Sequence, residues 1–456
     1  MLNRTPRRGF ATAAGFASLA LALAACSSGS SNTASSASAT STDPACAPYA
    51  QYGSHPGTTV TTFASILPPE QQLFEQAWAQ FSKCTGITIK YEGSDQFEAQ
   101  LPVRVAGGNA PNLAFIPQPG LLAKMVAKGD TKAPPQGVVD NVAKYWNPSI
   151  SDYGKVDGNL IGAPMSTNMK SLVWYSPSVF KAKGYAVPTT WDEMFKLSDK
   201  MVADQIKPWC GGIESGGATG WPSTDWLEQI VLRQQGGAVY NDWVAHTVKF
   251  DSPQITKAMD TLAAWMKNPA YVNAGFGDVR TIATTAFQDA GKPILSGKCG
   301  MLQQASFYAS FWANFKKNVN IDPAGDVFAF YLPTIDPAVV TPIVGGSETV
   351  TAFSDAPEVQ SFQWFLSSPE FHTARAKLGT WTSANTGVPQ DSYKGVSLLA
   401  VKYLADPKAT FRFDASDLMP AAVGAGAEWK QMTAWFGVGK PTQEVLQAID
   451  AAWPSS

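Results

Sequence analysis

The sequence predicts an α/β protein built from two domains. Short β-like runs alternate with segments of helical period along most of the chain, which is typical of layered α/β folds. Roughly 410 residues follow the N-terminal leader and the Ser-rich segment behind it, more than a single hydrophobic core usually serves. With 45% hydrophobic and 15% charged residues, the composition is that of a globular protein.

The alternation is clearest near the start of the folded region. Residues 58–63 are an expected strand, and residues 69–83 an expected helix because Phe74, Trp78 and Phe81 recur on one face. The same reasoning predicts strands at 87–91 and 113–116 and helices at 96–106 and 120–128.

Local signals mark elements in the rest of the chain. Asp157-Gly158 lies between two β-like runs, 153–156 and 160–161, which predicts a hairpin. Thr190 and Glu193 form a capping box that begins a helix through residue 202. Gly345-Gly346 predicts a turn. Further strands are expected at 171–175 and 326–331, and further helices from 252 and at 359–366, 370–378, 396–404, 428–435 and 442–452.

The first residues resemble an export signal. Arg4, Arg7 and Arg8 precede an apolar stretch, 9–25, that is too short and too Ala-rich for a membrane span. The closing Leu23-Ala24-Ala25-Cys26 resembles a bacterial lipobox, which predicts that residues 1–25 are removed and that Cys26 is diacylated. The alternative is an ordinary cleaved signal. The arginine pair also fits a twin-arginine signal loosely, so the export route stays open.

Residues 26–45 are expected to be the acylated cysteine and a flexible tether. Residues 27–43 are almost wholly Ser, Ala and Thr, which cannot bury enough apolar area to offset the entropy of ordering. A tether of this length spans roughly 20–25 Å.

Charge and cysteine content further limit the partners and the bound groups that we expect for this protein. Without the leader, 31 Lys and Arg stand against 36 Asp and Glu, and no basic run occurs, so nucleic acid is an unsuitable partner. Beyond Cys26, an even number of cysteines in an exported chain indicates disulfides. Three pairings are possible, and we favour Cys46 with Cys84 and Cys210 with Cys299. With three His and no C-x-x-C motif, a zinc site is not expected.

From residue 58 to the C-terminus the chain resembles the carbohydrate-binding proteins of ATP-driven sugar importers, whose best-known fold is that of maltose-binding protein. Within them it most resembles the α-glucoside-binding branch. The motifs that carry the resemblance are YEGSDQFEAQLPVRVAGGNAPNLAFIPQPG (91–120), APMSTNMKSLVWYSP (163–177), TTWDEM (189–194), PWCGGIESGGATGWPSTDW (208–226), GFGDVRTIATTAFQDAGKPIL (275–295), GGSETVTAF (345–353) and FRFDASDLMP (411–420).

The resemblance implies a periplasmic-binding-protein-like fold of two α/β lobes, with a ligand cleft between them that closes by a hinge motion. By analogy, the first lobe comprises residues 46–165 and 328–376, and the second 166–327 and 377–456. It also implies a monomer that takes a small carbohydrate ligand, partners membrane permease subunits, and uses no cofactor, metal or catalytic residue.

A sugar-binding cleft needs carboxylates and amides for the hydroxyls and flat aromatic rings for the C–H faces. Asp95 and Gln96 follow a predicted strand at its carboxyl end, where open α/β sheets place ligands. Asp95 fits an N-cap of the next helix equally well. Gln118 lies just past another strand and is held between two prolines. We predict that all three contact ligand.

The segment 220–226 is the richest candidate cluster. A loop framed by Gly and Pro presents Trp221 at a helix start as a stacking platform, while Ser223 or Thr224 could cap the helix. Asp225 suits either a ligand hydroxyl or the positive end of the helix.

Five further residues complete the predicted ligand site. Asn168 lies in the presumed hinge, and Glu348 follows two glycines that allow a ligand to approach the backbone. Trp381 lies in a loop where the second lobe should resume. Arg412 and Asp417 belong to a tight loop of mixed charge, where Arg412 could instead pair with Asp414.

These features favour a binding protein for a small α-glucoside of the maltose, trehalose or sucrose type. The main alternative is a secreted glycoside-processing enzyme, which needs two carboxylates at a set separation. A G-x-S-x-G nucleophile motif does not occur. A surface adhesion module is a third reading, which would use an exposed flat site instead of an enclosed cleft.

Overall fold

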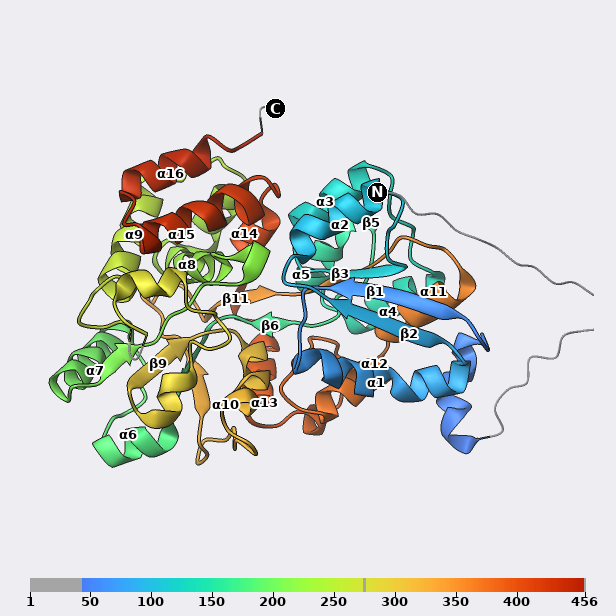
Figure 1. The fold of residues 1–456 in the computed structure, drawn as a ribbon, viewed down its shortest axis with the longest axis horizontal. Coiled ribbons are helices and arrows are strands. Elements are labelled where there is room, and N and C mark those ends of the chain that lie inside the picture. Colours follow the sequence, from blue (N-terminus) through green and yellow to red (C-terminus); the bar gives the residue numbers. More distant parts are fainter. Residues whose placement is uncertain (1–42, 274–275, 455–456) are drawn as a thin grey trace, which may run out of the picture. The chain divides into compact units, whose positions relative to one another are not determined.

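The computed structural model describes residues 43–273 and 276–454 (Figure 1). The predictions for residues 1–25, for Cys26 and for the tether up to residue 42 lie outside these residues. Within the part that is described, helices of the length and apolarity needed to cross a membrane do not occur.

A four-stranded sheet organises the first half of the fold. Its order is β12-β3-β1-β2, with β1 parallel to both neighbours and β12 antiparallel to β3. The strands are β1 (Thr59–Ala64), β2 (Thr88–Gly93), β3 (Leu113–Ile116) and β12 (Thr349–Ala352). Because β12 comes more than 200 residues after β3, this sheet joins two distant parts of the chain.

Helices cover both faces of this sheet, as the strand sequences require. In β3, Leu113 and Phe115 pack in a cluster with α1 (Glu70–Thr85), whereas Ala114 and Ile116 pack on the other face. This alternation follows the two-residue period of a strand. The other face is covered by α2 (Phe97–Ala106) and α3 (Pro119–Ala127), and the α1 face also by α11 (Pro357–Leu366) and α12 (Pro369–Lys377).

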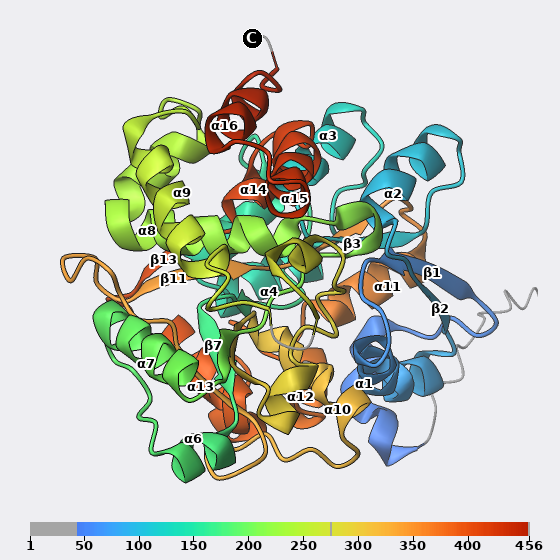
Figure 2. The same cartoon turned by 60° about the vertical axis from the view of Figure 1, so that its left-hand side comes forward.

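A second four-stranded sheet organises the other half, in the order β10-β7-β9-β8. Its strands are β7 (Leu172–Tyr175), β8 (Lys207–Trp209), β9 (Cys299–Gln303) and β10 (Phe328–Tyr331). Helices α8 and α9 pack against each other in the core cluster of this half (Figure 2). The longer helices of its largest core cluster are α6 (Pro177–Lys183), α7 (Trp191–Ala203), α8 (Trp221–Val244), α9 (Pro253–Met266), α15 (Trp429–Gly437) and α16 (Thr442–Asp450).

A small third sheet lies where the chain passes between the two halves (Figure 1). In it β11 (Pro342–Gly346) is antiparallel to β6 (Asn168–Met169) and parallel to β13 (Thr410–Phe413). The turn expected at Gly345-Gly346 is wrong, because both residues belong to β11. A Cβ on Gly345 would lie 2.5 Å from Cε2 of Phe411, so glycine here permits the close approach of β13.

Most predicted elements are confirmed within a few residues. The capping box is present, because Thr190 Oγ1 accepts from Glu193 N and Glu193 Oε2 accepts from Thr190 N, both at 3.2 Å. The hairpin is also confirmed, with β4 (Lys155–Val156) paired to β5 (Asn159–Leu160). Elements without a clear sequence signal were missed, among them β8, β9, β13, α4 (Gln136–Tyr145), α5 (Pro148–Ser151), α10 (Trp312–Phe315) and α14 (Ala415–Leu418).

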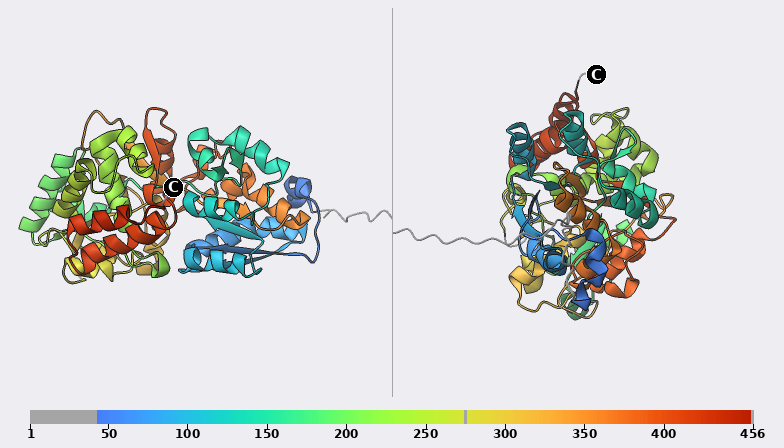
Figure 3. Two further views of the ribbon diagram at one scale, coloured as in Figure 1. Left: turned by 90° about the horizontal axis from the view of Figure 1, so that it is seen from above. Right: turned by 90° about the vertical axis from the view of Figure 1, so that its right-hand side faces the viewer.

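The core clusters place the lobe boundaries differently from the resemblance. Because β10 pairs with β7, residues 328–344 join the second lobe, and because Trp381 packs on Phe74, residues 377–393 join the first. In Figure 3 the orange helices α11 and α12 accordingly lie among the N-terminal elements. We propose a first lobe of residues 43–165 and 349–393, and a second of 169–344 and 395–454, which includes α13 (Gly395–Leu404).

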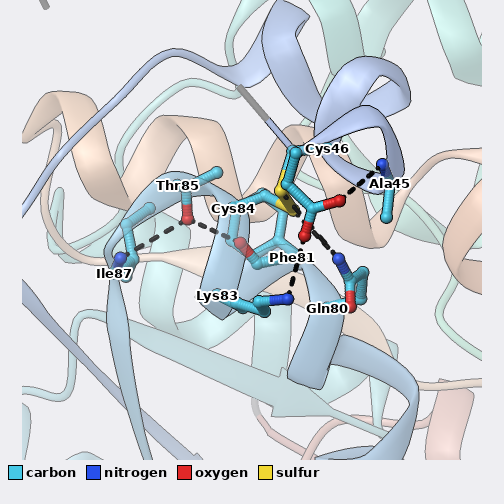
Figure 4. Close-up of a disulfide and its surroundings, with 9 residues drawn as sticks. Ala45, Cys46, Gln80, Phe81, Lys83, Cys84, Thr85 and Ile87 are labelled. Carbon is cyan, nitrogen blue, oxygen red and sulfur yellow. Dashed lines mark hydrogen bonds and ion pairs between the residues drawn. A yellow bond between two sulfur atoms is a disulfide. The ribbon is translucent and has the colours of Figure 1, made fainter. Parts of the chain in front are cut away.

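Both favoured disulfides are confirmed. Cys46 is bonded to Cys84 with a Cα–Cα distance of 5.2 Å, and Cys210 to Cys299 at 5.9 Å. The first bond ties the 3-10 helix η1 (Pro44–Tyr52) to the end of α1 (Figure 4). The sequence separations are 38 and 89 residues. Loops of these lengths correspond to about 4 and about 4.6 kcal/mol in the chain-entropy treatment.

His372 is a neutral histidine in the core of the first lobe. Its Nε2 lies 3.1 Å from the carbonyl oxygen of Leu366, which only accepts, so Nε2 carries the proton. Its Nδ1 then accepts from the Ser383 hydroxyl at 2.7 Å. Burial lowers the pKa of His372 to about 3, although its bond to Leu366 opposes that shift.

This histidine should make stability depend on pH. Because the pKa is below its unfolded value, the unfolded chain binds more protons, and stability is lost as pH falls from 6.5 towards 3. Between pH 7 and 4.5 the contribution is about 2–3 kcal/mol. We expect His372→Gln to lose less stability over this interval than the wild type, measured by urea unfolding at both pH values. Equal losses in the two proteins would contradict this assignment.

Candidate functional site

A cavity lies between the two lobes. Its volume is about 160 Å3, which leaves room for a small molecule and not only for single waters. One wall comes from the loops after β1, β2 and β3, which is where parallel strands place ligands. The residues lining this wall are Ser65, Ile66, Leu67, Glu70, Asp95, Glu98, Pro117 and Gln118.

The remaining walls come from the crossing segments and from the second lobe. The strands β6 and β11 and the segments that follow them contribute Asn168, Lys170, Gly346, Ser347 and Glu348. The second lobe contributes Ser215, Ala218, Trp221, Phe287, Gln288, Phe307, Phe311, Asp414, Asp417 and Trp429.

Aromatic rings form one continuous surface of the second-lobe wall. The ring of Trp221 is edge-on to Phe287 at 4.9 Å between centroids, and Phe307 lies 6.0 Å away. Trp221 is the first residue of α8 and follows Gly220, whose φ is 117°. A Cβ on Gly220 would lie 2.3 Å from the carbonyl oxygen of Trp429, so only glycine fits at this helix start.

Lys170 is the centre of a buried ion-pair cluster in the cavity wall. Its Nζ donates to Asp225 Oδ1 at 2.8 Å and also to Asp414 Oδ2, and its side chain is 9% exposed. The ammonium lies 5.3 Å from the centroid of the Trp221 ring. The cluster therefore joins the segment after β6 to α8 and to the end of β13.

The pKa values in this cluster follow from burial and the shared cation. Burial acts to lower the pKa of Lys170, but Asp225 and Asp414 outweigh it and raise that pKa well above its usual range. Burial likewise opposes ionisation of Asp414, yet Lys170 and the hydrogen bonds to Asp414 lower its pKa to about 2. Burial raises the pKa of Asp225. Asp414 is thus the ionised partner of Lys170.

Burial also shifts the pKa values of the carboxyl groups that the first lobe and the hinge contribute to the cavity. It raises the pKa of Glu70 to about 8 and raises those of Glu98 and Glu348. Gln118 Nε2 donates to Glu98 Oε1 at 3.1 Å, and the Ser166 hydroxyl donates to Glu348. A carboxyl that can hold or release a proton can accept from a ligand hydroxyl or donate to one.

Two amide oxygens in the cavity wall lack a donor. Gln118 Oε1 and Asn168 Oδ1 are buried and have no hydrogen-bond partner among the described residues. A buried acceptor left unpaired costs about 1–3 kcal/mol. Both side chains line the cavity, so a ligand with hydroxyl donors there would satisfy them.

Polar contacts between the lobes lie at the rim of the cavity. Gly217 N donates to the carbonyl oxygen of Asp95 at 3.0 Å. A Cβ on Gly120 would lie 2.1 Å from the carbonyl oxygen of Met419, so the start of α3 touches the second lobe. These contacts join the lobes beside the cavity.

The structure brings together six of the ten predicted ligand residues around this cavity. They are Asp95, Gln118, Asn168, Trp221, Glu348 and Asp417. Asp95 does not cap a helix with its side chain, because the Ser94 hydroxyl accepts from Gln96 N instead. Gln96 does not line the cavity, and its side chain lies beside Gly217 at the rim. The proposed cap of α8 by Ser223 or Thr224 is wrong, since both hydroxyls donate to backbone carbonyls.

Three further candidates lie away from the cavity. Asp225 does not line the cavity, and its Oδ1 accepts a hydrogen bond from Lys170 Nζ at 2.8 Å. Trp381 is 1% exposed in the first-lobe core, edge-on to Phe74 at 6.2 Å, because residues 377–393 pack there. Arg412 lines a separate hollow near α5 and donates to the carbonyl oxygens of Phe411 and Gly237 at 2.8 and 3.3 Å. It does not pair with Asp414.

Sequence reasoning missed several residues of the cavity. Lys170 was visible as a charge two residues after Asn168 inside an apolar motif, and Glu70 as an acid at the strand-to-helix loop after β1. No local signal marked Phe287, Phe307 and Phe311. An aromatic residue in a ligand site has the same local sequence pattern as one in the core.

One buried group of carboxylates has the spacing of a metal site. Oxygens of Asp225, Glu228 and Asp414 lie within 4.8 Å of one another. The ammonium of Lys170 already contacts Asp225 and Asp414, so it supplies the positive charge that these carboxylates need.

Comparison with known proteins points to one family. A family model described as bacterial extracellular solute-binding protein matches residues 65–371. The osmoprotective compounds-binding protein GgtB of Synechocystis is 35% identical over 87% of this chain and 92% of its own length. The α-glucosides-binding periplasmic protein AglE of Rhizobium meliloti is 34% identical over 88% of each chain.

Solved structures with the same fold are sugar-binding receptors of low sequence identity. The bacterial solute receptor AcbH, described with a preference for β-D-galactopyranose, aligns with a TM-score of 0.72 at 20% identity, over 86% of this chain and 98% of that one. Maltose-bound MalE3 of T. maritima aligns with a TM-score of 0.64 at 17% identity, with the same coverage. This similarity establishes the two-lobed α/β fold.

Replacing Lys170 by Met should destabilise the protein strongly. The change leaves ionised Asp414 buried without its counter-ion and Asp225 without the hydrogen bond from Lys170. Removing one partner of a buried ion pair typically costs about 3–5 kcal/mol. Urea unfolding would measure the loss, and Lys196→Met, an exposed position on α7, is the matched control with an effect within about 0.5 kcal/mol. Equal stability of the two variants would show that Lys170 is not the hub of the cluster.

Proposed function

The chain belongs to the family of bacterial extracellular solute-binding proteins, and we propose that it binds a small α-glucoside and delivers it to an ATP-driven importer. The ligand would be of the maltose, trehalose or sucrose type, held in the cavity between the lobes. Capture, closure of the lobes and docking to the permease subunits would complete the cycle.

Names of relatives support the choice of ligand class. AglE is described as binding α-glucosides and GgtB as binding osmoprotective compounds, and both match this chain over nearly its whole length. The family and these relatives are binding proteins, so the chain is a binding protein and not the secreted glycoside-processing enzyme that was the alternative.

The observation that carries the proposal is the pair of unpartnered amide oxygens on two side chains that line the cavity. Gln118 and Asn168 need donors, and a polyol supplies them. Carboxyl groups opposite can take further hydroxyls, while Trp221 and its neighbouring Phe rings offer a surface for the C–H faces of a sugar. A neutral sugar, with hydroxyl groups around its ring, therefore suits this cavity.

A thermal-shift panel of maltose, trehalose, sucrose and unrelated sugars on the mature domain tests the proposal. Ligand at 100 times its Kd should stabilise the fold by about 2.7 kcal/mol, which is roughly 3 °C for a chain of this size. We expect Trp221→Ala to lose this rise and to keep its ligand-free midpoint within a few degrees, because Trp221 is only half-buried.

Trp453→Ala is the matched control, since Trp453 is also half-buried but stacks on His246 away from the cavity. It should bind ligand normally. Normal binding by Trp221→Ala, or a response to no sugar in the panel, would contradict the proposed function.

The family places the protein outside the cytoplasm, and we further propose that a lipid on Cys26 anchors it to the cell membrane. The support is the lipobox-like Leu23-Ala24-Ala25-Cys26 and the Ser-rich tether behind it. Cys26→Ser should release soluble protein or leave an unprocessed precursor, measured by membrane fractionation and mass spectrometry of the N-terminus. Unchanged lipid attachment in that variant would exclude this anchor.

A further inference from the structure

A fully buried arginine lies directly behind the cavity wall. Arg375 of α12 is 0% exposed, and its guanidinium lies 4.8 Å from the ring centroid of Phe74 and 5.5 Å from that of Trp381. Nη1 donates to the carbonyl oxygen of Gly379 at 2.8 Å. Nε and Nη2 have no hydrogen-bond partner among the described residues. This cation is therefore held by rings and one carbonyl oxygen.

The charged partner of Arg375 reaches the cavity. Glu70 is the first residue of α1 and lines the cavity, and its Oε1 lies 3.8 Å from Arg375 Nη2. That separation is too long for a hydrogen bond but close enough for a strong interaction at low dielectric. One carboxyl group thus connects the ligand cavity to a buried positive charge.

We propose that Arg375 is a positioning residue for ligand binding, which holds the Glu70 carboxyl in the cavity wall while Trp381 and Phe74 hold Arg375. This inference rests on the proposed function, because it requires a ligand in the cavity. It also gives Trp381 a role: the ring acts on the site from behind the wall without touching the ligand.

Stability alone does not account for this arrangement. A buried ion pair is weak evidence for stability, since apolar side chains of similar volume often do as well or better. Here two donors of the arginine are also unsatisfied, which adds a cost. What the arginine does supply is a positive potential behind the Glu70 carboxyl group, and this potential lowers the pKa of Glu70 against the effect of burial.

The protonation of Glu70 provides a readout for this role. Burial raises the pKa of Glu70 to about 8, with Arg375 lowering it and Glu348 raising it further. Tyr91 also faces Glu70, and its pKa is raised well above its usual range, so it stays neutral here. Glu70 therefore passes from largely neutral to ionised between pH 7 and 9. An ionised carboxylate accepts a stronger hydrogen bond from a hydroxyl.

The test is calorimetric affinity for the sugar that gives the largest thermal shift, at pH 7, 8 and 9. In the wild type, affinity should rise about fivefold between pH 7 and 9, the difference expected between a neutral and a charge-assisted hydrogen bond. Glu70→Gln should remove this rise. Arg375→Met should weaken binding at pH 8 and displace the rise to higher pH, and Arg375→Lys should restore part of both.

The double substitution separates positioning from a general effect on the fold. In the Glu70→Gln background, Arg375→Met should change affinity by less than about twofold, because the two residues act as one unit. Arg233→Met is the control: Arg233 is also 0% exposed but bonds to the carbonyl oxygens of Leu332 and Pro342 in the second lobe. It should lower stability and leave the pH profile unchanged.

The possible failures are distinguishable. If the wild type binds no sugar in the panel, the proposed function is wrong. If it binds but the two substitutions are additive, or if Arg233→Met moves the pH profile as Arg375→Met does, the positioning role is overturned. Glu70→Gln keeps the side-chain shape, so an unchanged wild-type profile in that variant overturns the inference even where Arg375→Met does not fold.

Discussion

The rest of the ligand site depends on the contacts that the buried ammonium of Lys170 makes with Asp225 and Asp414. Lys170 lies on the segment after β6, one of the connections between the lobes, and contacts carboxylates from α8 and from the end of β13. Without this cation, two buried acids would face each other across the wall. Because it is present, Trp221, Asp414 and Asp417 are held on one surface of the cavity.

The cavity depends equally on glycines that let segments meet closely. Because glycine has no side chain, the backbone at Trp429 can lie against Gly220 and the backbone at Met419 against Gly120. The ring of Phe411 lies against Gly345 for the same reason. A side chain at any of these three positions would clash with the neighbouring segment, so each glycine permits a close approach that shapes the cavity. Polar groups from residues 65 to 429 thereby line one cavity.

The site has two layers with different chemistry. Side chains in contact with the cavity offer carboxyl groups, amides and aromatic rings, which suit a neutral polyol. Buried charges lie within or behind this layer: the ion pair of Lys170 with Asp414 in the cavity wall, and Arg375 behind Glu70. Burial raises the pKa values of the carboxyl groups in the first-lobe and hinge walls, and Arg375 acts against that shift at Glu70 as Lys170 does at Glu348.

The sequence by itself determined the local elements and the residues tied to them. Period and capping signals predicted most helices and strands, and Asp95 and Gln118 could be placed because a strand's carboxyl end is a local property. Only tertiary structure decided that Trp381 and Arg412 lie away from the cavity and that Glu70 and Lys170 line it. The physical reason is that an aromatic or charged side chain has the same local pattern in a core and in a site, and packing against residues hundreds of positions away determines which of the two it joins.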